Sequence, residues 1–362
     1  MTRIAILTPS ITTGDAVSND VLGMYDVLKE RGYDARVFAE GWTIKEPRVW
    51  PSPQVGSFLK QPRDILIYHY SRGWDPGLDL LRELKCRKII KYHNVTPPEF
   101  LAGYNSDFAA MCLEGRQQLG LIARSGSDLY LSDSAYNLRE LVAEGAAESQ
   151  SFVVPPFHHV DRLDSIEPDP DVLNGCSDGK VNICMVGRVA PNKSHPALIE
   201  AFAAYHHDYN PNSRLIIAGK EEVRLGKYSA LLRAMVSRLK LQDDVVFTGE
   251  VSDRALRAYY DAAHVFMITS EHEGFCVPLV EAMAMKIPIV AYASTAIPET
   301  VGSAGLVWEE RNPYLLAESI KSIVGDRSIS QALSTMGWRR YAGHFTNARI
   351  EAGFLSAING LL

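Results

Sequence analysis

The sequence predicts an α/β protein with two doubly wound parallel sheets, and three observations support this prediction. Short apolar runs alternate with amphipathic segments along the whole chain. The runs are apolar throughout, which is typical of strands covered on both faces of a parallel sheet. With 362 residues, the chain is also long enough for two hydrophobic cores.

The first half of the chain predicts five strands with helices between them. Helical spacing follows the first, third and fifth strands, so each connection is long enough to cross over to a parallel neighbour. The expected strands are 4–7, 35–38, 64–68, 88–92 and 128–132, and the expected helices are 20–31, 75–84 and 135–144.

The second half repeats this alternation with six strands. A short helix at 278–285 precedes the fifth of them and is expected to pack against it. The expected strands are 181–186, 214–219, 245–249, 265–269, 287–292 and 305–308, and longer helices are expected at 196–205 and 228–239.

The two series are separated by residues 156–180, which are rich in Pro, Asp, Ser and Gly. We interpret this segment as an interdomain connector. The N-terminal domain then spans 1–155 and the C-terminal domain 181–345, while 346–362 has helical spacing and would pack back across the joint. Doubly wound domains that face each other bind ligands at the carboxyl ends of their strands, in a central cleft.

Composition limits the classes of function. The apolar fraction of 46% and the charged fraction of 22% are typical of a soluble globular protein, and the net charge of −6 argues against a nucleic-acid partner. Five cysteines without a C-x-x-C pair, and no signal sequence, indicate reduced thiols in a cytoplasmic protein.

Membrane association is expected to be peripheral at most. No apolar run approaches the roughly 20 residues of a membrane-spanning helix. The basic segment 82–91 has two interpretations: a solvated helix end, or a patch for an anionic lipid or the inner face of the plasma membrane.

The turn after the first strand contains Gly14 and leads into a helix. Backbone N–H groups at a helix N-terminus suit an anion. An ordinary strand-to-helix turn, capped by Asp15 or Asn19, is the alternative. Neither the dinucleotide fingerprint G-x-G-x-x-G nor the P-loop pattern occurs in the chain.

His93 and Asn94 follow the fourth strand, and Pro97-Pro98 turn the chain away. A lone histidine is usually structural. The carboxyl end of a parallel strand is, however, the place where functional side chains gather, so His93 is a candidate catalytic residue.

Gly187, Arg188 and Lys193 lie in the loop that follows the strand 181–186 and opens a helix. Arginine can bind a phosphate through two N–H groups, and lysine acts as a point charge, so the pair suits a diphosphate. Two solvated loop cations are the alternative interpretation.

The stretch from Ser270 to Tyr292 places three glutamates beside apolar elements. Pro278 occupies the first turn of the predicted helix, which leaves the N–H groups of residues 274–276 available for an anion or a sugar hydroxyl. Glu273 and Glu281 would accept hydrogen bonds from hydroxyls. Glu271 has no expected partner and is interpreted as a loop residue near the cleft.

No metal site or cofactor is expected. The only D-x-D string is Asp169-Pro170-Asp171, which lies in the connector and not at a strand end. The pairs His158-His159 and His206-His207 are expected to be surface residues.

These motifs resemble those of the retaining, nucleotide-sugar-dependent glycosyltransferases of family four, which have the GT-B fold of two Rossmann-like domains. The resemblance covers nearly all of the C-terminal domain; in the N-terminal domain it rests on the Gly14 turn and His93-Asn94. Its motifs are E-x7-E from Glu273 to Glu281, GRVAPNK (187–193), IAG (217–219), FTGEV (247–251) and IPETVGSAGLVW (297–308).

The resemblance implies a role for each matching residue. Arg188 and Lys193 would bind the donor diphosphate and stabilise the leaving group, Glu273 would hold the donor-sugar hydroxyls, and Glu281 would hold the ribose hydroxyls. His93 would lie across the cleft beside the transferred sugar. The remaining donor-binding positions are Gly14, Gly187, Val251, Gly274, Phe275 and Cys276. Many relatives have two adjacent glycines where this chain has T-T-G-D.

The expected activity is transfer of a hexose, with mannose as one candidate, from a GDP- or UDP-linked sugar to a saccharide or polyprenyl-linked acceptor in polysaccharide or glycan biosynthesis. The resemblance implies retention of configuration without a metal ion. Alternatives are a nucleotide-sugar epimerase, a phosphorylase, or a sugar-nucleotide-binding subunit without activity. A phosphorylase would be expected to carry a cofactor lysine. A subunit without activity would be expected to lack one of the four candidate catalytic residues, which are His93, Arg188, Lys193 and Glu273.

Overall fold

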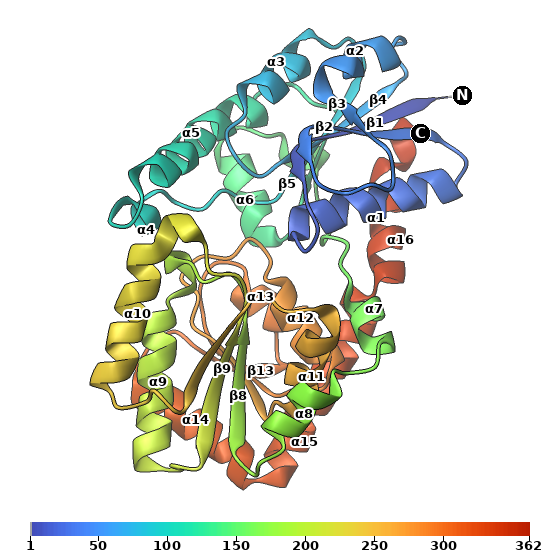
Figure 1. The fold of residues 1–362 in the computed structure, drawn as a ribbon. Coiled ribbons are helices and arrows are strands. Elements are labelled where there is room, and N and C mark those ends of the chain that lie inside the picture. Colours follow the sequence, from blue (N-terminus) through green and yellow to red (C-terminus); the bar gives the residue numbers. More distant parts are fainter. Residues whose placement is uncertain (1) are drawn as a thin grey trace. The chain divides into compact units, whose positions relative to one another are not determined.

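The protein, described here by a computed structural model for residues 2–362, folds into two compact units (Figure 1). The first unit contains residues up to Pro98 together with Ala109–His159 and Thr346–Leu362. The second unit contains Glu99–Phe108 and Val160–Phe345.

The first unit is built on a seven-stranded parallel sheet in the order β3-β2-β1-β4-β5-β6-β7. All five predicted strands are present. The two that the pattern missed, β3 and β7, have three residues each and lie at the sheet edges, so they are too short to show a periodicity. The strands are β1 (Arg3–Ile11), β2 (Asp34–Trp42), β3 (Val49–Pro51), β4 (Ile65–Tyr70), β5 (Arg87–Tyr92), β6 (Leu129–Ser132) and β7 (Ser151–Val153).

Helices cover both faces of this sheet, and each face has its own apolar core. The C-terminal helix α16 contributes Ile350, Phe354 and Ile358 to the core that also contains residues of α1. It therefore folds as part of the first unit. The helices are α1 (Ala16–Glu30), α2 (Val55–Phe58), α3 (Asp75–Glu83), α5 (Ser106–Ala123), α6 (Ala135–Ala143) and α16 (Asn347–Ile358).

The second unit is built on a six-stranded parallel sheet in the order β10-β9-β8-β11-β12-β13. All six predicted strands are present. They are β8 (Val181–Val186), β9 (Ser213–Ala218), β10 (Val245–Gly249), β11 (Val265–Ile268), β12 (Ile289–Tyr292) and β13 (Gly305–Trp308). The helices are α4 (Glu99–Ala102), α7 (Val160–Ser165), α8 (Pro170–Cys176), α9 (His195–Asp208), α10 (Gly226–Arg238), α11 (Asp253–Ala262), α12 (Val277–Ala284), α13 (Ile297–Val301), α14 (Pro313–Gly325) and α15 (Arg327–Arg340).

Two segments group with the second unit although neither was predicted as part of it. Residues 160–180 of the expected connector form α7 and α8, and Val160 and Leu163 lie in the core beside α12. Residues 99–108 place Phe100 against His272 and Tyr104 against Tyr228, with ring centroids 6.2 and 5.1 Å apart. These ring contacts pack residues 99–108 against the second unit, although in the chain the segment lies between two parts of the first unit.

Three residues that were expected at the surface are buried. His158 and His206 have side chains inside the fold, so the prediction of surface histidines holds for His159 and His207 alone. His206 Nδ1 lies 3.1 Å from Ser213 Oγ, and burial lowers the pKa of His206. In the basic segment, Lys91 is fully buried and cannot belong to a surface patch. Helices cover both faces of this sheet, so the side chains from Ile89 to Tyr92 are all buried, which the local charge run concealed.

Asp169 of the D-x-D string caps α8, accepting hydrogen bonds from the N–H groups of Asp171 and Val172 at 3.0 and 3.3 Å. Within residues 2–362, no helix combines the length and the apolar character needed to cross a membrane.

Candidate active site

The loop after β8 is shaped by two glycines with positive φ. Gly187 has φ 152° and Gly219 has φ 154°. A Cβ atom on Gly219 would lie 2.0 Å from the Gly187 carbonyl oxygen, so the two backbones can cross only where Gly219 has no side chain. The Gly187 N–H donates to the Ala218 carbonyl at 2.9 Å. This crossing fixes the direction in which the chain leaves β8 toward Arg188.

Arg188 and Lys193 differ in what they contact. The Arg188 side chain is exposed and forms no ion pair with any residue from 2 to 362. Lys193, at the end of a short 3₁₀ turn (Pro191–Lys193), is mostly buried. Its Nζ lies 2.6 and 2.8 Å from the two carboxylate oxygens of Glu273. Lys193 and Glu273, which were predicted to bind different parts of a ligand, therefore form an ion pair with each other.

Glu273 is held in place by the loop that precedes α12. Its backbone N–H donates to Thr295 Oγ1 at 2.8 Å, and its side chain is 7% exposed. A buried carboxylate needs a positive partner, and Lys193 supplies it. Because the contact is a single flexible ammonium on both oxygens, Lys193 can exchange the carboxylate for a phosphate, and Glu273 can accept hydrogen bonds from hydroxyls instead.

The N-terminus of α12 leaves backbone donors unused. Cys276 has φ 77°, in the left-handed region, and no side chain caps the helix. The N–H groups of Gly274, Phe275 and Cys276 donate to no acceptor within the described part of the chain. Unpaired N–H groups at a helix N-terminus attract anions, so the geometry can receive a phosphate or a sugar oxygen.

Glu281 lies inside α12 against the apolar core of the second unit. Its Oε2 accepts a hydrogen bond from the Tyr260 hydroxyl at 2.6 Å. Burial raises the pKa of Glu281 above its ordinary value, and burial beside this carboxylate also raises the pKa of Tyr260. A carboxyl group kept in apolar surroundings with one tyrosine is costly to ionise, which is typical of groups retained for ligand binding.

Glu271 is a loop residue, as expected, but the structure gives it partners that the sequence did not indicate. Its Oε1 accepts from Ser194 Oγ at 2.9 Å and forms an ion pair with Arg311. Its backbone N–H donates to the Asn192 carbonyl at 2.8 Å. These contacts tie the Lys193 loop to the Glu273 loop. Both side-chain partners are distant in sequence, so local sequence could not reveal them.

Val251, which was assigned to donor binding, lies in the loop after β10 and is partly buried. In the first unit, Gly14 has φ 76° in the turn after β1, where a Cβ would meet no atom within 4 Å. Asp15 caps α1 by accepting from the Ser18 N–H at 2.9 Å. The capping interpretation of this turn is therefore confirmed for Asp15.

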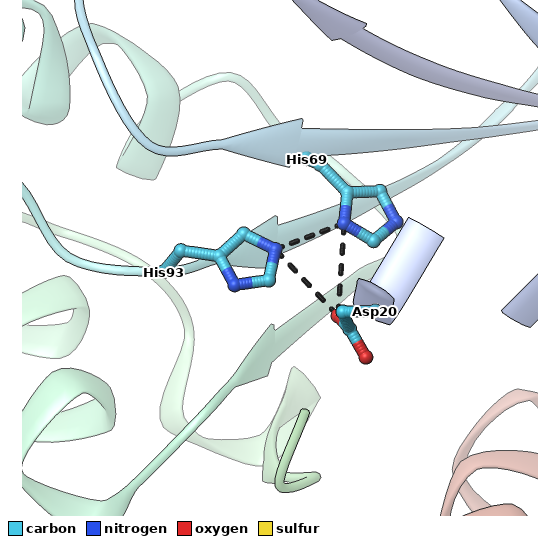
Figure 2. Close-up of side chains that lie close together, drawn as sticks. All are labelled: Asp20, His69 and His93. Atoms are coloured by element: carbon cyan, nitrogen blue, oxygen red, sulfur yellow. Dashed lines mark hydrogen bonds and ion pairs between the residues drawn. The ribbon is translucent and has the colours of Figure 1, made fainter. Parts of the chain in front are cut away.

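His93 follows β5 in the first unit, and both of its ring nitrogens are engaged. Nδ1 lies 2.9 Å from Asp133 Oδ2, and Nε2 lies 2.9 Å from Nδ1 of His69. Lys91 Nζ lies 2.6 Å from the other oxygen of Asp133. Asp20 of α1 completes this buried cluster, with Oδ2 3.6 Å from both histidines (Figure 2).

Sequence reasoning missed four members of this cluster. Burial raises the pKa of Asp20, and burial next to His93 and Lys91 lowers the pKa of His69 well below its ordinary value, so His69 is neutral. Ion pairs and hydrogen bonds from His93 and Lys91 lower the pKa of Asp133 against the effect of its burial. A usable signal existed: His69, Lys91 and Asp133 all lie at the carboxyl ends of strands.

Comparison with known proteins relates these features to a family. Residues 174–338 match the family described as Glycosyl transferases group 1. The mannosylfructose-phosphate synthase of Agrobacterium fabrum is 34% identical over 255 residues, which cover 64% of this chain and 55% of that protein. The O-antigen chain mannosyltransferase B of Escherichia coli is 28% identical over 152 residues, covering 42% and 39%. The chain thus spans about half the length, or less, of these curated relatives.

Solved structures extend the likeness to both units. The crystal structure of the Anabaena protein HepE in complex with UDP and glucose matches with a TM-score of 0.78 at 16% identity, covering 99% of this chain and 100% of that one. Sucrose-phosphate synthase from Thermosynechococcus elongatus matches with a TM-score of 0.78 at 18% identity, covering 100% and 99%. At such identities the likeness establishes the fold, which is the GT-B type with two Rossmann-like sheets. The match to the glycosyl transferases group 1 is confined to residues 174–338, which lie within the second unit.

Proposed function

We propose that the protein is a retaining glycosyltransferase that moves a hexose from a nucleotide diphosphate sugar to a saccharide or polyprenyl-linked acceptor. The observation that carries this proposal is the grouping at the strand ends of the second unit. There, Lys193 pairs with Glu273, and Glu273 directly precedes residues 274–276, whose three N–H groups have no acceptor among the described residues.

The charges suit the departure of a diphosphate. Breaking the bond between the sugar C1 and the phosphate oxygen develops negative charge on the leaving group and positive charge on the sugar. Arg188 is exposed and unpaired among the described residues, and Lys193 becomes available once Glu273 turns to the sugar hydroxyls. Cations positioned in advance stabilise such charge. No divalent metal ion is then required at the diphosphate.

Retention of configuration is proposed from the family resemblance. The acceptor hydroxyl attacks C1 on the face from which the diphosphate leaves, a new C–O bond forms, and the hydroxyl proton passes to the departing phosphate oxygen. Glu273 acts as a hydroxyl-binding group and not as a nucleophile. His93 and the Gly14 turn are proposed to contribute from the first unit, His93 beside the transferred sugar.

The remaining proposed donor contacts come from two loops, from the start of α12 and from Glu281 within it. Gly187 allows the close loop, Val251 is proposed to contact the donor, and the N–H groups of Gly274, Phe275 and Cys276 bind phosphate or sugar oxygens. Glu281 accepts hydrogen bonds from the ribose hydroxyls, which replace or supplement the single bond from Tyr260. The raised pKa of Glu281 supports this role, because an unsatisfied carboxyl gains most from new donors.

Two nucleotides are candidates for the donor. GDP-mannose is favoured by similarity to a relative from Mycobacterium tuberculosis, the GDP-mannose-dependent α-(1-6)-phosphatidylinositol monomannoside mannosyltransferase, which is 26% identical over 227 residues. UDP-glucose is the second candidate, because it is the ligand in a HepE structure. A polyprenyl-linked acceptor would bring the protein to the inner face of the plasma membrane as a peripheral enzyme.

The test is incubation with a panel of UDP-, GDP- and ADP-sugars and measurement of nucleoside diphosphate release, with and without brief exposure to EDTA. We expect release from one donor class, unchanged by EDTA, and a glycoside product whose anomeric configuration by NMR equals that of the donor. Inverted product would overturn retention, and loss of release in EDTA would overturn metal independence.

The same panel separates the alternatives. An epimerase would convert the nucleotide sugar into its epimer without an acceptor, and a phosphorylase would require inorganic phosphate. A binding subunit without activity would bind a donor in calorimetry but release nothing with any acceptor. Any of these three results would replace the transferase proposal.

A further inference from the structure

Three side chains of the first unit bring one ligand atom each to a common point. They are Asp20 from α1, His69 from β4 and His93 just after β5 (Figure 2). His69 Nδ1 and His93 Nε2 are 2.9 Å apart, and Asp20 Oδ2 lies 3.6 Å from each of them. The three atoms therefore form a small triangle from which solvent is excluded.

The second nitrogen of His93 determines what its first nitrogen offers. Nδ1 faces Asp133 Oδ2 at 2.9 Å, and an ionised carboxylate only accepts hydrogen bonds. Nδ1 therefore carries the proton, and in the neutral ring Nε2 presents a lone pair to His69. A contact of 2.9 Å between two ring nitrogens requires a proton or a cation between them.

A proton alone leaves a carboxylate oxygen unsatisfied. If His69 Nδ1–H donates to His93 Nε2, that proton is used between the two rings and none is directed at Asp20. Asp20 Oδ2 is then a buried acceptor without a hydrogen-bond partner, whereas His69 Nε2 has no partner in either case. A buried acceptor left without a donor costs about 1–3 kcal/mol. A cation inside the triangle would use the lone pairs of all three atoms.

The size of the triangle suits a first-row divalent ion. A point equidistant from three atoms with these separations lies about 2 Å from each, which is the distance at which Zn²⁺ binds imidazole nitrogen and carboxylate oxygen. The ligand types, two imidazoles and one carboxylate, are those that zinc takes up with three protein ligands.

The neighbouring groups orient the ligands as in known metal sites. Asp133 holds the far nitrogen of His93, the carboxylate–histidine arrangement that fixes the tautomer of a ligating imidazole. The Phe157 N–H donates to Asp20 Oδ1 at 2.8 Å, leaving Oδ2 for the ion.

Charge is consistent with an added cation. The two carboxylates of Asp20 and Asp133 face one ammonium, that of Lys91. Lys91 donates to the Val154 carbonyl and forms an ion pair with Asp133 Oδ1 at 2.6 Å, and its Nζ lies 3.8 Å from Asp20 Oδ2, beyond a hydrogen bond. One ammonium thus serves two carboxyl groups.

We propose that Asp20, His69 and His93 bind a divalent transition-metal ion, with Zn²⁺ the best match in size and ligand type. The ion would join α1 to the ends of β4 and β5, and its role would be structural. All three ligands belong to the first unit, whereas the residues proposed to bind the diphosphate belong to the second. The ion would occupy His93 Nε2 in place of a contact between His93 and the transferred sugar, so the proposal replaces that one role and is independent of the diphosphate-binding residues.

The first test measures metal in the wild-type protein, produced without a polyhistidine tag and dialysed against metal-free buffer. Elemental analysis is expected to find about one zinc per chain, since sites of this kind retain their ion. Protein refolded with Co²⁺ after removal of the ion with a chelator in denaturant is expected to show visible d–d absorption. Absence of zinc as purified, together with no uptake of Zn²⁺ or Co²⁺ on refolding, would overturn the proposal.

The second test compares Asp20→Asn and His69→Gln with His207→Gln, a matched control at an exposed histidine of the second unit. The first two variants are expected to lose most of the bound metal, and the control to keep it. Equal metal content in all three would mean adventitious binding and refute the site. If the buried variants do not fold, the wild-type measurements decide alone. No donor or acceptor is present, so failure here leaves the proposed transferase reaction intact.

Discussion

The polar side chains at the carboxyl ends of the strands differ between the two sheets. In the first unit, the side chains of Asp20, Lys91, His93 and Asp133 are buried and contact one another. At the strand ends of the second unit, Arg188 is exposed and the N–H groups of residues 274–276 are unused by the described chain.

The difference separates two uses of the same topology. Buried charges that pair within the protein fix the geometry of their surroundings, and burial closes them to an anionic ligand from solvent. Exposed cations and free N–H groups remain available to bind an anion. The Lys193–Glu273 pair is intermediate, since it is paired but close enough to solvent to exchange partners. Four substitutions test this contrast.

The largest effect is expected from Lys91→Met, which removes the only ammonium of the buried cluster. Asp133 and Asp20 would be left with unbalanced charge in a fully buried place, at a cost of about 3–5 kcal/mol. Urea unfolding should show a lower midpoint for this variant. Lys88 is half-buried in the same strand as Lys91 and is therefore unsuitable as a control. The control is Lys85→Met, because Lys85 is exposed. Unchanged stability in Lys91→Met would mean that the cluster does not depend on its internal pairing.

Lys193→Ala should remove the charge that stabilises the leaving diphosphate. We expect turnover to fall by about 10²–10³-fold, the effect of losing one preorganised electrostatic contact. The fold should persist, as judged by circular dichroism, although Glu273 loses its partner. Lys227→Ala, an exposed lysine of α10, is the matched control and should retain wild-type nucleotide release. Wild-type turnover in Lys193→Ala would refute the leaving-group role.

Glu281→Gln should separate stability from binding. Burial raises the folded pKa of Glu281 above its ordinary value, so the folded state binds this proton more tightly than the unfolded state. Wild-type stability then falls as pH rises through that interval, and the ionised group costs stability at neutral pH. The variant should melt at a higher temperature than wild type at pH 7, and the gain should vanish in acid.

The same variant should bind the donor about tenfold more weakly, because a neutral amide accepts hydroxyl hydrogen bonds less strongly than a carboxylate. Calorimetry with the accepted donor measures this loss. Glu318→Gln, on the exposed face of α14, provides the comparison. Lower stability at pH 7 together with unchanged donor affinity would remove Glu281 from the binding site.

The smallest effect is expected from Glu271→Gln. The ion pair with Arg311 is about one-third exposed on both sides, and such pairs contribute about 0.2–1 kcal/mol. Gln keeps an acceptor for Ser194, so the loop that carries Lys193 should stay in place. Thermal unfolding should shift slightly and turnover should change less than in Lys193→Ala. A loss of turnover as large as that of Lys193→Ala would mean that Glu271 contacts the ligand itself.

Local pattern predicted most of the framework. The strands β8 to β13 and five of the seven in the first sheet appear as apolar runs because both faces of a parallel strand are covered. The edge strands β3 and β7 escaped, since three residues hold no period. The segment 99–108 was assigned by chain order, whereas its rings pack on His272 and Tyr228 of the second unit.

The candidate site divides in the same way. Gly187, Arg188, Lys193, Glu273 and Glu281 could be proposed from the sequence because they lie in short motifs, each next to a strand end or a helix start. The pairing of Lys193 with Glu273 was not, because the two residues are 80 positions apart. Glu271 was misjudged for the same reason, its partners being Ser194 and Arg311.

The sequence by itself determined the two parallel sheets, the family resemblance and the chemical types at the strand ends, because periodicity and short motifs are local properties. Tertiary structure alone decided which charges meet. Lys91 appeared as one cation in a basic run, and only the covering of both faces of β5 and the closeness of α1 and β6 bury it with Asp20 and Asp133. Burial and pairing arise from residues far apart in the chain, and they determine whether a charge serves the fold or a ligand.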